Sequence, residues 1–254
     1  DGDTAQPEVW QKLDRLLAED WPHQRGGSLP IRVLCIDSGY ATQEVYSWVR
    51  NHPQAVWGGA GARASQPRTV VAIKGRDTDT SLILSVSKAD TGGKRLGLRV
   101  WNVSGPVAKT ELYRWLKLPR LTDEERERGE IEAPGSCHFP EYGEQYFKQL
   151  TAERRVIRIH KGFPRATWEK DPTRNNEALD CRVYARAAAS IYGLDRFTDR
   201  QWQKMREAIE SLPVEQDEQI AVTTTHPAVE APQPSKTKPI FKQRATAVAD
   251  DPYL

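Results

Sequence analysis

The stretch "IRVLCIDSGY", residues 31–40, joins a nearly unbroken apolar run to an abrupt Asp-Ser-Gly ending. A short run of this kind predicts a buried central strand in a sheet that is covered on both faces. A second buried run follows at residues 68–75 ("RTVVAIKG"), and the alternating stretch at 97–104 ("GLRVWNVS") predicts a third strand. Segments with helical periodicity lie before, between and after these strands, at residues 6–20, 42–50 and 106–118. The alternation of strands and helices predicts an α/β fold.

The carboxyl-terminal half has a different pattern. A charged segment with Pro119, Gly129 and Pro134 predicts an exposed loop over residues 119–135. Further elements are predicted as a short helix at 142–150, a hairpin at 154–162 and 165–170, and helices at 175–192 and 198–211. Residues 213–254 are rich in Pro, Thr, Lys and Ala and poor in large apolar side chains, which predicts a flexible tail. We therefore expect one folded domain over residues 1–212.

Composition excludes several classes of protein. The 254 residues contain no apolar run of the length that a membrane span needs, so we expect no membrane partner. Three widely spaced cysteines, Cys35, Cys137 and Cys181, argue against a disulfide framework or a zinc site. The net charge of +2 does not by itself predict a nucleic-acid partner.

Asp37 is the first candidate for a functional residue. It ends the apolar run of residues 31–40, and sites in α/β sheets lie at the carboxyl ends of strands. A carboxylate fixed there, beside Gly39, can hold a hard cation that remains open to a substrate. The alternative is that Asp-Ser-Gly supplies only the turn and the N-cap of the next helix.

Glu177 and Asp180 lie three residues apart in "RNNEALDCRVYARAA", so they share one face of the predicted helix. Acids in a first turn also interact favourably with the helix dipole, which alone explains Glu177. Asn175 or Asn176 can cap this helix. The helix is apolar nearly all round, so we expect it to be buried, and a buried Asp180 needs a partner or a metal. Both interpretations of Asp180 stay open.

Two acids from distant parts of the chain, Asp37 and Asp180, predict a Mg²⁺ or Mn²⁺ site, with Glu177 as a possible third member. Hard divalent cations prefer carboxylate oxygens and keep waters for phosphate substrates. A two-metal arrangement would hydrolyse phosphodiester bonds. Such a site calls for a further carboxylate, and the remaining candidates, Asp77 and Asp79, have the pattern of loop residues.

Basic residues provide candidates for DNA contact. Lys74 ends the second apolar run, and Arg158 and Lys161 belong to a basic hairpin. Each could bind DNA phosphates, and each could equally be a solvated surface residue. His138, beside Phe139 and Pro140, is more typical of a packed or surface histidine than of a metal ligand.

An ordered set of segments resembles a known family. The segments are "RVLCIDSGY", "VVAIKGR", "LYRWLKL", "GSCHFP", "FKQLTAER" and "RNNEALDCRVYARAA". Over residues 1–192 the chain resembles the carboxyl-terminal nuclease domain of the large terminase subunit of lambda-type tailed phages, and "NEALDC" is the most specific piece.

The resemblance implies an RNase H-like central mixed sheet flanked by helices. It implies a two-metal-ion endonuclease that cuts concatemeric phage DNA during packaging, in the cytoplasm of the host cell. The implied partners are double-stranded DNA, the small terminase subunit and the portal protein. In such folds the acids lie on a first strand, a later strand and a late helix; Asp37 and Asp180 match the last two. By the same resemblance, the first strand, its Asp and an ATP-binding domain would lie upstream of residue 1.

Two other functions are compatible with these residues. The first is a non-catalytic module of the packaging motor that binds DNA or portal, in which the acids are only structural. The second is another RNase H-like enzyme, such as a junction resolvase or a transposase, which the ordered set of segments disfavours.

Overall fold

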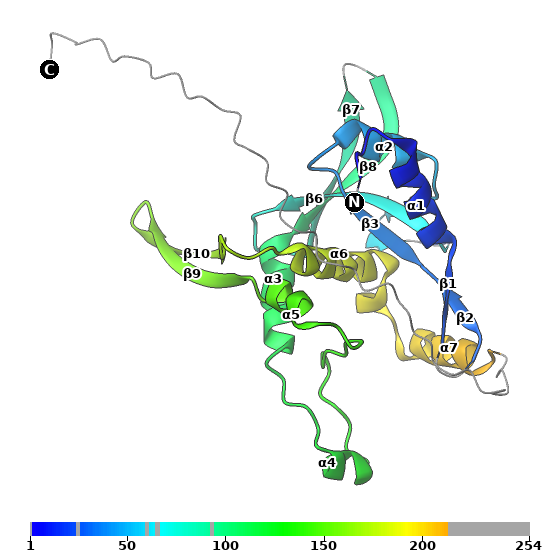
Figure 1. The fold of residues 1–254 in the computed structure, drawn as a ribbon, viewed down its shortest axis with the longest axis vertical. Coiled ribbons are helices and arrows are strands. Elements are labelled where there is room, and N and C mark those ends of the chain that lie inside the picture. The colour runs from blue at the N-terminus through cyan, green and yellow to red at the C-terminus, as the bar shows by residue number, and fades with distance from the viewer. Residues whose placement is uncertain (1, 24–25, 59–60, 64–66, 92–93, 213–254) are drawn as a thin grey trace, which may run out of the picture. The chain divides into compact units, whose positions relative to one another are not determined.

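The computed structural model describes residues 2–23, 26–58, 61–63, 67–91 and 94–212 (Figure 1). Its helices are α1 (Pro7–Ala18), α2 (Thr42–Arg50), α3 (Gly105–Trp115), α4 (Asp123–Glu127), α5 (Glu144–Leu150), α6 (Glu177–Tyr192), the 3₁₀ helix η1 (Leu194–Arg196) and α7 (Asp199–Glu210). Its strands are β1 (Asp20–Pro22), β2 (Ser28–Pro30), β3 (Val33–Asp37), β4 (Val56–Gly58), β5 (Gly61–Arg63), β6 (Thr69–Arg76), β7 (Ile83–Thr91), β8 (Lys94–Ser104), β9 (Glu153–His160) and β10 (Phe163–Lys170).

The central sheet has four strands in the order β3-β6-β8-β7. β3 pairs with β6 and β6 pairs with β8 in parallel, whereas β7 is antiparallel to β8, so the sheet is mixed. Because parallel strands run in the same direction, the carboxyl ends of β3, β6 and β8 all lie at one edge of the sheet. The prediction of an α/β fold with a mixed central sheet is confirmed.

Side chains alternate between the two faces of each strand, and each face has its own hydrophobic core. On one face, Val71, Ile73, Trp101 and Val103 pack with buried residues of α3, α5 and α6. On the other, a second cluster joins the sheet to α1 and α2; its buried members are Leu17, Val45, Tyr46, Trp48, Val49, Val70, Ala72, Leu98 and Val100. The sheet is therefore covered on both faces, which explains the unbroken apolar runs of its strands.

Ion pairs hold α3 against α6. The Arg186 guanidinium on α6 binds the Glu111 carboxylate on α3, with an Nε–Oε2 distance of 2.6 Å, and it also pairs with Asp195. The same guanidinium lies over the Trp115 ring, 5.8 Å from its centroid. This position of α6 brings its first turn to the carboxyl end of β3.

Several sequence-based expectations need correction. The segment predicted as a loop over residues 119–135 contains the short helix α4, which begins with a capping box between Thr122 and Glu125. Helix α6 is buried along one face and not all round, since Glu177, Cys181 and Ala185 are exposed. The sequence analysis also missed β7 and the short hairpins β1–β2 and β4–β5. The predicted tail, residues 213–254, lies outside the described residues.

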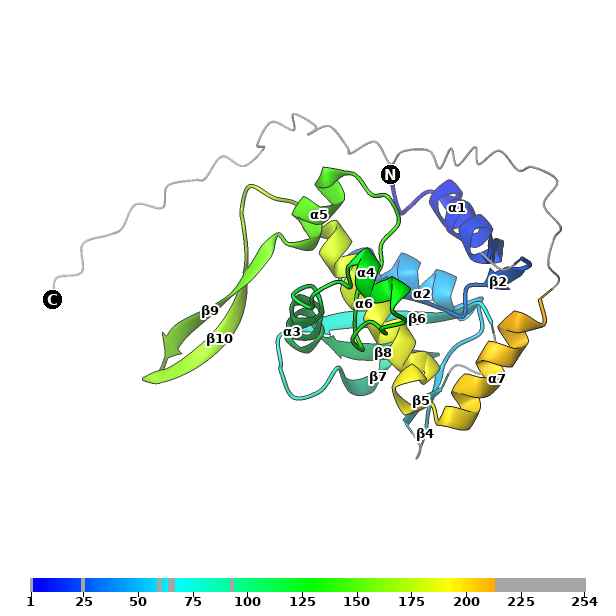
Figure 2. The same ribbon diagram turned by 90° about the horizontal axis from the view of Figure 1, so that it is seen from below.

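The predicted basic hairpin is confirmed as β9–β10. It extends away from the sheet and its helices in both views (Figures 1 and 2). No helix among the described residues is long and apolar enough to cross a membrane.

Candidate functional site

Asp37 occupies the last position of β3, and its side chain is exposed at the edge of the sheet. Its carboxylate accepts a hydrogen bond from the Gly39 backbone N–H, at an N–Oδ1 distance of 2.9 Å. A Cβ atom at Gly39 would lie 3.4 Å from both carboxylate oxygens, so the glycine allows close approach to Asp37. The turn interpretation of Asp37 is therefore correct as far as it goes, because the carboxylate accepts the hydrogen bond of the turn.

Tyr184 connects Asp37 to α6. Its hydroxyl hydrogen-bonds to the Asp37 carboxylate. Burial raises the pKa of Tyr184, and the negative charges of Asp37 and Asp180 raise it further. The hydroxyl also lies 3.7 Å from where a Cβ at Gly75 would stand, so β6 approaches it closely. Tyr184 therefore remains a neutral donor that orients Asp37, a role that the sequence analysis did not assign.

Asp180 lies in the first turn of α6 and is half-buried. Burial is the main cause of its raised pKa, and the positive charge of Lys109 opposes the increase. The negative charges of Glu153, Asp37 and Glu177 act in the same direction as burial. The structure thus brings the three predicted acids into one electrostatic environment, in which their mutual repulsion would be relieved by a cation.

The Asn176 side chain holds Asp180 in place. Asn176 occupies the N-cap position of α6, but its side chain makes no capping hydrogen bond. Its amide Nδ2 donates instead to Asp180 Oδ2 at 3.2 Å and to Glu153 Oε1 at 3.0 Å. The expected cap is supplied partly by Gln149 of α5, whose side-chain oxygen accepts from the Ala178 backbone N–H at 3.2 Å. Asn176 therefore positions Asp180 and does not cap the helix.

Glu153 is the buried acid that the sequence analysis missed. Only 7% of this residue is exposed, and its Oε2 pairs with Lys109 Nζ at 2.7 Å. Its backbone oxygen accepts a hydrogen bond from the Tyr113 hydroxyl. In sequence it begins the basic segment "ERRVIRIH", and its partner Lys109 lies 44 residues away. A buried Glu needs such a partner, but nothing local in the sequence identifies it.

Oxygen donors from carboxylates fit a hard divalent cation at this edge of the sheet. Asp37 and Asp180 are the residues that would hold it, with Glu177 beside them in the first turn of α6. Glu153 is already neutralised by Lys109. Within the part of the chain that the structure describes, no group of three or more His, Cys, Asp or Glu residues could hold a metal ion. The cation would therefore depend on these few acids and on water.

The predicted DNA-binding residues lie apart from these acids. Asp37 stands level with Ile73 in the parallel register, and both side chains lie on the face of the sheet that packs on α6. Alternation along β6 places the next residue, Lys74, on the opposite face. Arg158 and Lys161 lie in the β9–β10 hairpin, where Arg158 pairs with Glu169.

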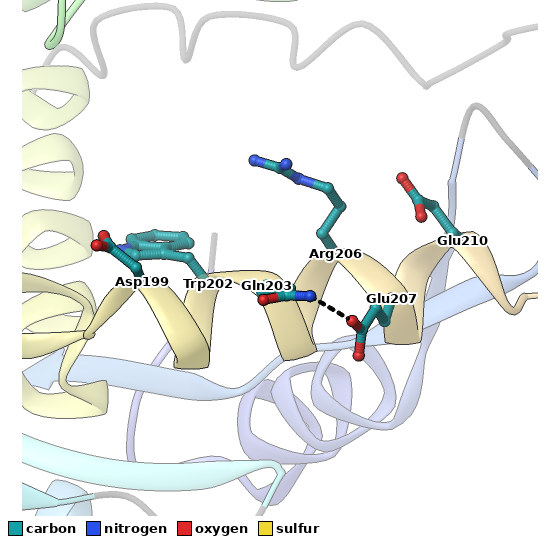
Figure 3. Close-up of a pocket in the computed structure, with 6 residues that line it drawn as sticks. All are labelled: Asp199, Trp202, Gln203, Arg206, Glu207 and Glu210. Atoms are coloured by element: carbon teal, nitrogen blue, oxygen red, sulfur yellow. Dashed lines mark hydrogen bonds between the residues drawn. The ribbon is translucent and has the colours of Figure 1, made fainter.

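Two other candidate features have no part in the site. The exposed His138 contacts Glu132, with an Nε2–Oε2 distance of 2.8 Å. A surface hollow of about 430 Å³ runs along α7 (Figure 3). It is lined by Asp199, Trp202, Gln203, Arg206, Glu207 and Glu210. None of the predicted site residues lines this hollow.

The chain was compared with known proteins. The model of a family described as the endonuclease domain of the terminase large subunit gpA matches residues 1–202. The chain belongs to this terminase family. The acids at the carboxyl end of β3 and on α6 both lie within the matched region. The family resemblance predicted from the sequence is therefore confirmed.

Two relatives of the terminase domain show how much of a whole subunit it represents. It is 24% identical over 184 residues to the terminase large subunit of Escherichia phage lambda, covering 71% of this chain and 25% of the relative. It is 27% identical over 190 residues to that of Enterobacteria phage P21, covering 75% and 27%. The chain thus spans about a quarter of the length of these relatives. No solved structure matches it.

Removing the Lys109 ammonium should leave the buried Glu153 carboxylate of this terminase domain without its ion-pair partner. We expect Lys109→Met to lower the free energy of unfolding by about 3–5 kcal/mol, because Glu153 is then left buried without its partner. Adding Glu153→Gln should recover most of that loss, since the double variant has no buried charge. Urea unfolding of the wild type, both single variants and the double variant measures the coupling. Additive effects of the two substitutions would contradict a mutually neutralising pair.

The raised pKa of Asp180 predicts a stability effect of definite sign. A carboxyl whose pKa is higher in the folded than in the unfolded state favours folding while it is protonated. This contribution to the free energy of unfolding is lost as the pH rises through the folded-state pKa and the group ionises. Metal-free Asp180→Asn should therefore be more stable than the wild type at pH 7. The gain should vanish below about pH 3, under the ordinary Asp pKa of about 3.9. The control is Asp123→Asn on α4, whose side chain is 94% exposed; an equal gain there would refute the explanation.

Proposed function

We propose that this chain is a metal-dependent DNA endonuclease domain, with an RNase H-like arrangement of its sheet and helices. The observation that supports this most directly is the position of Asp180 in the first turn of α6, where the Asn176 amide holds its carboxylate at 3.2 Å. Burial and the neighbouring carboxylates of Glu153, Asp37 and Glu177 raise the pKa of Asp180 there. Mutual repulsion within such a cluster of carboxylates destabilises the fold. Carboxylates with shifted pKa values concentrate at functional sites. Membership of the terminase endonuclease family gives the cluster a chemical role.

The reaction would be hydrolysis of a phosphodiester bond. Mg²⁺ or Mn²⁺, when bound, supplies an activated water and neutralises charge on the phosphate, as in two-metal nucleases. Asp37 and Asp180 would hold the cation. Tyr184 and Asn176 fix the two carboxylates through hydrogen bonds, which limits the reorganisation needed when DNA binds. Glu177, exposed in the same turn, would accept hydrogen bonds from the water around the cation.

The basic residues would contact the DNA backbone outside the catalytic centre. Arg158 and Lys161 lie on the hairpin whose first residue, Glu153, is linked to Asp180 through Asn176. Lys74 lies at the same edge of the sheet as Asp37 but on its other face. We therefore assign it to a phosphate away from the cut. Contacts of this kind position the duplex and carry no base specificity.

In the whole protein, the domain would cut concatemeric phage DNA during packaging in the host cytoplasm. The proposed partners are double-stranded DNA, the small terminase subunit and the portal protein, and ATP binding is assigned to an upstream domain. A third metal-binding acid would come from a strand upstream of residue 1. The competing proposal is a non-catalytic DNA- or portal-binding module. It is favoured by the lack, among the described residues, of a group of three or more His, Cys, Asp or Glu side chains that could hold a metal ion.

Plasmid cleavage distinguishes the two functions. We expect a chain extended upstream by about 30–40 residues, roughly a strand hairpin, to cut plasmid DNA with Mn²⁺ or Mg²⁺ and to stop with EDTA. Asp37→Ala and Asp180→Ala should each reduce cleavage by at least about a hundredfold, because each removes a proposed metal ligand. Asp123→Ala on α4 is the matched control and should cut normally. If Asp180→Ala cuts at the wild-type rate, the assignment of Asp180 is wrong.

The salt dependence of DNA binding tests the role of the hairpin separately from cleavage. Arg158→Gln combined with Lys161→Gln should weaken binding to all sequences alike and reduce the slope of log K against log salt by about 2, roughly one for each lost phosphate contact. Fluorescence anisotropy without metal, at several salt concentrations, measures this slope. Arg128→Gln with Lys148→Gln removes the same charge outside the hairpin. An equal change in slope for that pair would show that only total charge matters.

A further inference from the structure

Contacts with α3 anchor the β9–β10 hairpin at its base. There, the Trp168 ring packs edge-on against Tyr113 of α3, with ring centroids 4.8 Å apart. The Tyr113 hydroxyl bonds the first residue of β9, Glu153. Beyond this base both strands extend away from the sheet and its helices (Figures 1 and 2). At about 3.3 Å per residue, eight residues give a ribbon roughly 26 Å long.

The strand register gives this ribbon two chemically different faces. Residues directly opposite each other in an antiparallel pair share a face. One face, which we call the basic face, has the opposed pairs Arg154 and Glu169, Val156 and Thr167, Arg158 and Arg165, and His160 and Phe163. The other, which we call the apolar face, has the outer pairs Ile157 and Ala166, and Ile159 and Pro164.

The basic face has unbalanced positive charge. Arg158 and Arg165 stand directly opposite each other, an arrangement of like charges that destabilises a sheet. Glu169 pairs with Arg158, but among the described residues Arg165 has no carboxylate partner. Lys161 adds a further cation at the turn. A row of phosphates would remove this repulsion, which makes a polyanion the natural ligand of the face.

Phe163 lies at the outer end of the same basic face. Its side chain is 75% exposed, and it follows Lys161 and Gly162, both of which have positive φ angles of 50° and 84°. The turn thus presents a bare aromatic ring between cations, about 26 Å from the base of the hairpin. Burial of an exposed Phe side chain is favourable, so the ring gains from any apolar surface that meets the basic face. In a duplex, that surface is the stacked bases.

We propose that the β9–β10 hairpin is a DNA-deforming ribbon and that Phe163 is its wedge. The arginines of the basic face hold the phosphates, and the Phe163 ring inserts against a base step and unstacks it. Apolar wedges flanked by cations are the means by which ribbons kink a duplex. At 3.4 Å per base pair, the kink would lie about eight base pairs from the acids. The proposal rests on the DNA-binding function proposed above but not on catalysis.

The apolar face provides a matched control. Ile159 is 71% exposed at the same end of the ribbon, but its side chain is on the face opposite to Phe163. Phe163→Ala and Ile159→Ala therefore remove similar exposed apolar groups from opposite faces. Neither residue is buried, so neither substitution should affect folding. If a protein partner instead covered the hairpin, the Ile159 face would be the more important one and DNA bending would be unaffected by Phe163.

The test uses the 254-residue chain with EDTA present, so that no cleavage occurs. A duplex of about 24 base pairs, roughly 80 Å long at 3.4 Å per base pair, has a donor and an acceptor dye at its ends. Energy transfer reports the bend, and 2-aminopurine substituted along the duplex reports unstacking. The wild type and Ile159→Ala should bend the duplex and raise the 2-aminopurine fluorescence. Phe163→Ala should do neither, and its affinity should fall about tenfold through the lost stacking.

The outcomes separate the wedge from the general function. Bending by Phe163→Ala equal to that of the wild type, or an equal loss in Ile159→Ala, would overturn the wedge. Binding by the wild type without any bend would also overturn it and would leave the nuclease proposal intact. No binding by the wild type would overturn the wedge together with the DNA-binding function. Failure of the Asp180→Ala cleavage test alone would remove the catalytic proposal and leave the wedge standing.

Discussion

The parallel pairing of β3, β6 and β8 is the constraint on which the rest of the structure depends. It requires long connections between strands; the one between β3 and β6 supplies α2, the one between β6 and β8 supplies β7, and the other covering helices precede β3 or follow β8. Two separate hydrophobic clusters then hold α1 and α2 on one face and α3, α5 and α6 on the other. Because all three strands end at the same edge, Asp37 has a fixed place there, and the packing of α6 on the sheet determines which side chains can meet it.

A buried ion pair joins the β9–β10 hairpin to α3, which packs on the sheet. Lys109 from α3 and Glu153 from β9 neutralise each other, and Asn176 joins the pair to Asp180. Three segments that are distant in sequence therefore meet at one carboxylate. The energetic reason is simple: a carboxylate taken out of water requires a cation or several donors, and Glu153 has both. Through the Asn176 amide, this arrangement fixes the position of the Asp180 carboxylate.

The sequence predicts best those features that are fixed by local patterns. Continuous apolar runs identified β3 and β6, an alternating pattern identified β8, and the strand ending placed Asp37 correctly at the edge. It failed where distant residues decide the outcome. β7 has only a weak pattern of its own and is defined by its pairing with β8. Asn176 was expected to cap a helix because caps are local, but Glu153 and Asp180 compete successfully for its amide. The sequence also could not tell which face of the sheet Lys74 occupies; the strand register places it on the face opposite to Asp37.

Glu153 has two structural roles. It is the first residue of the β9–β10 hairpin, and it is the ion-pair partner of Lys109. The base of the hairpin therefore lies at the acid cluster, and its tip lies far from it. With an arm of about 26 Å, moving the tip by one base-pair step of 3.4 Å corresponds to a rotation of roughly 7° at the base. A rotation of this size would move Glu153, whose carboxylate shares the Asn176 amide with Asp180. The base of the hairpin and the acids are therefore joined by one set of hydrogen bonds.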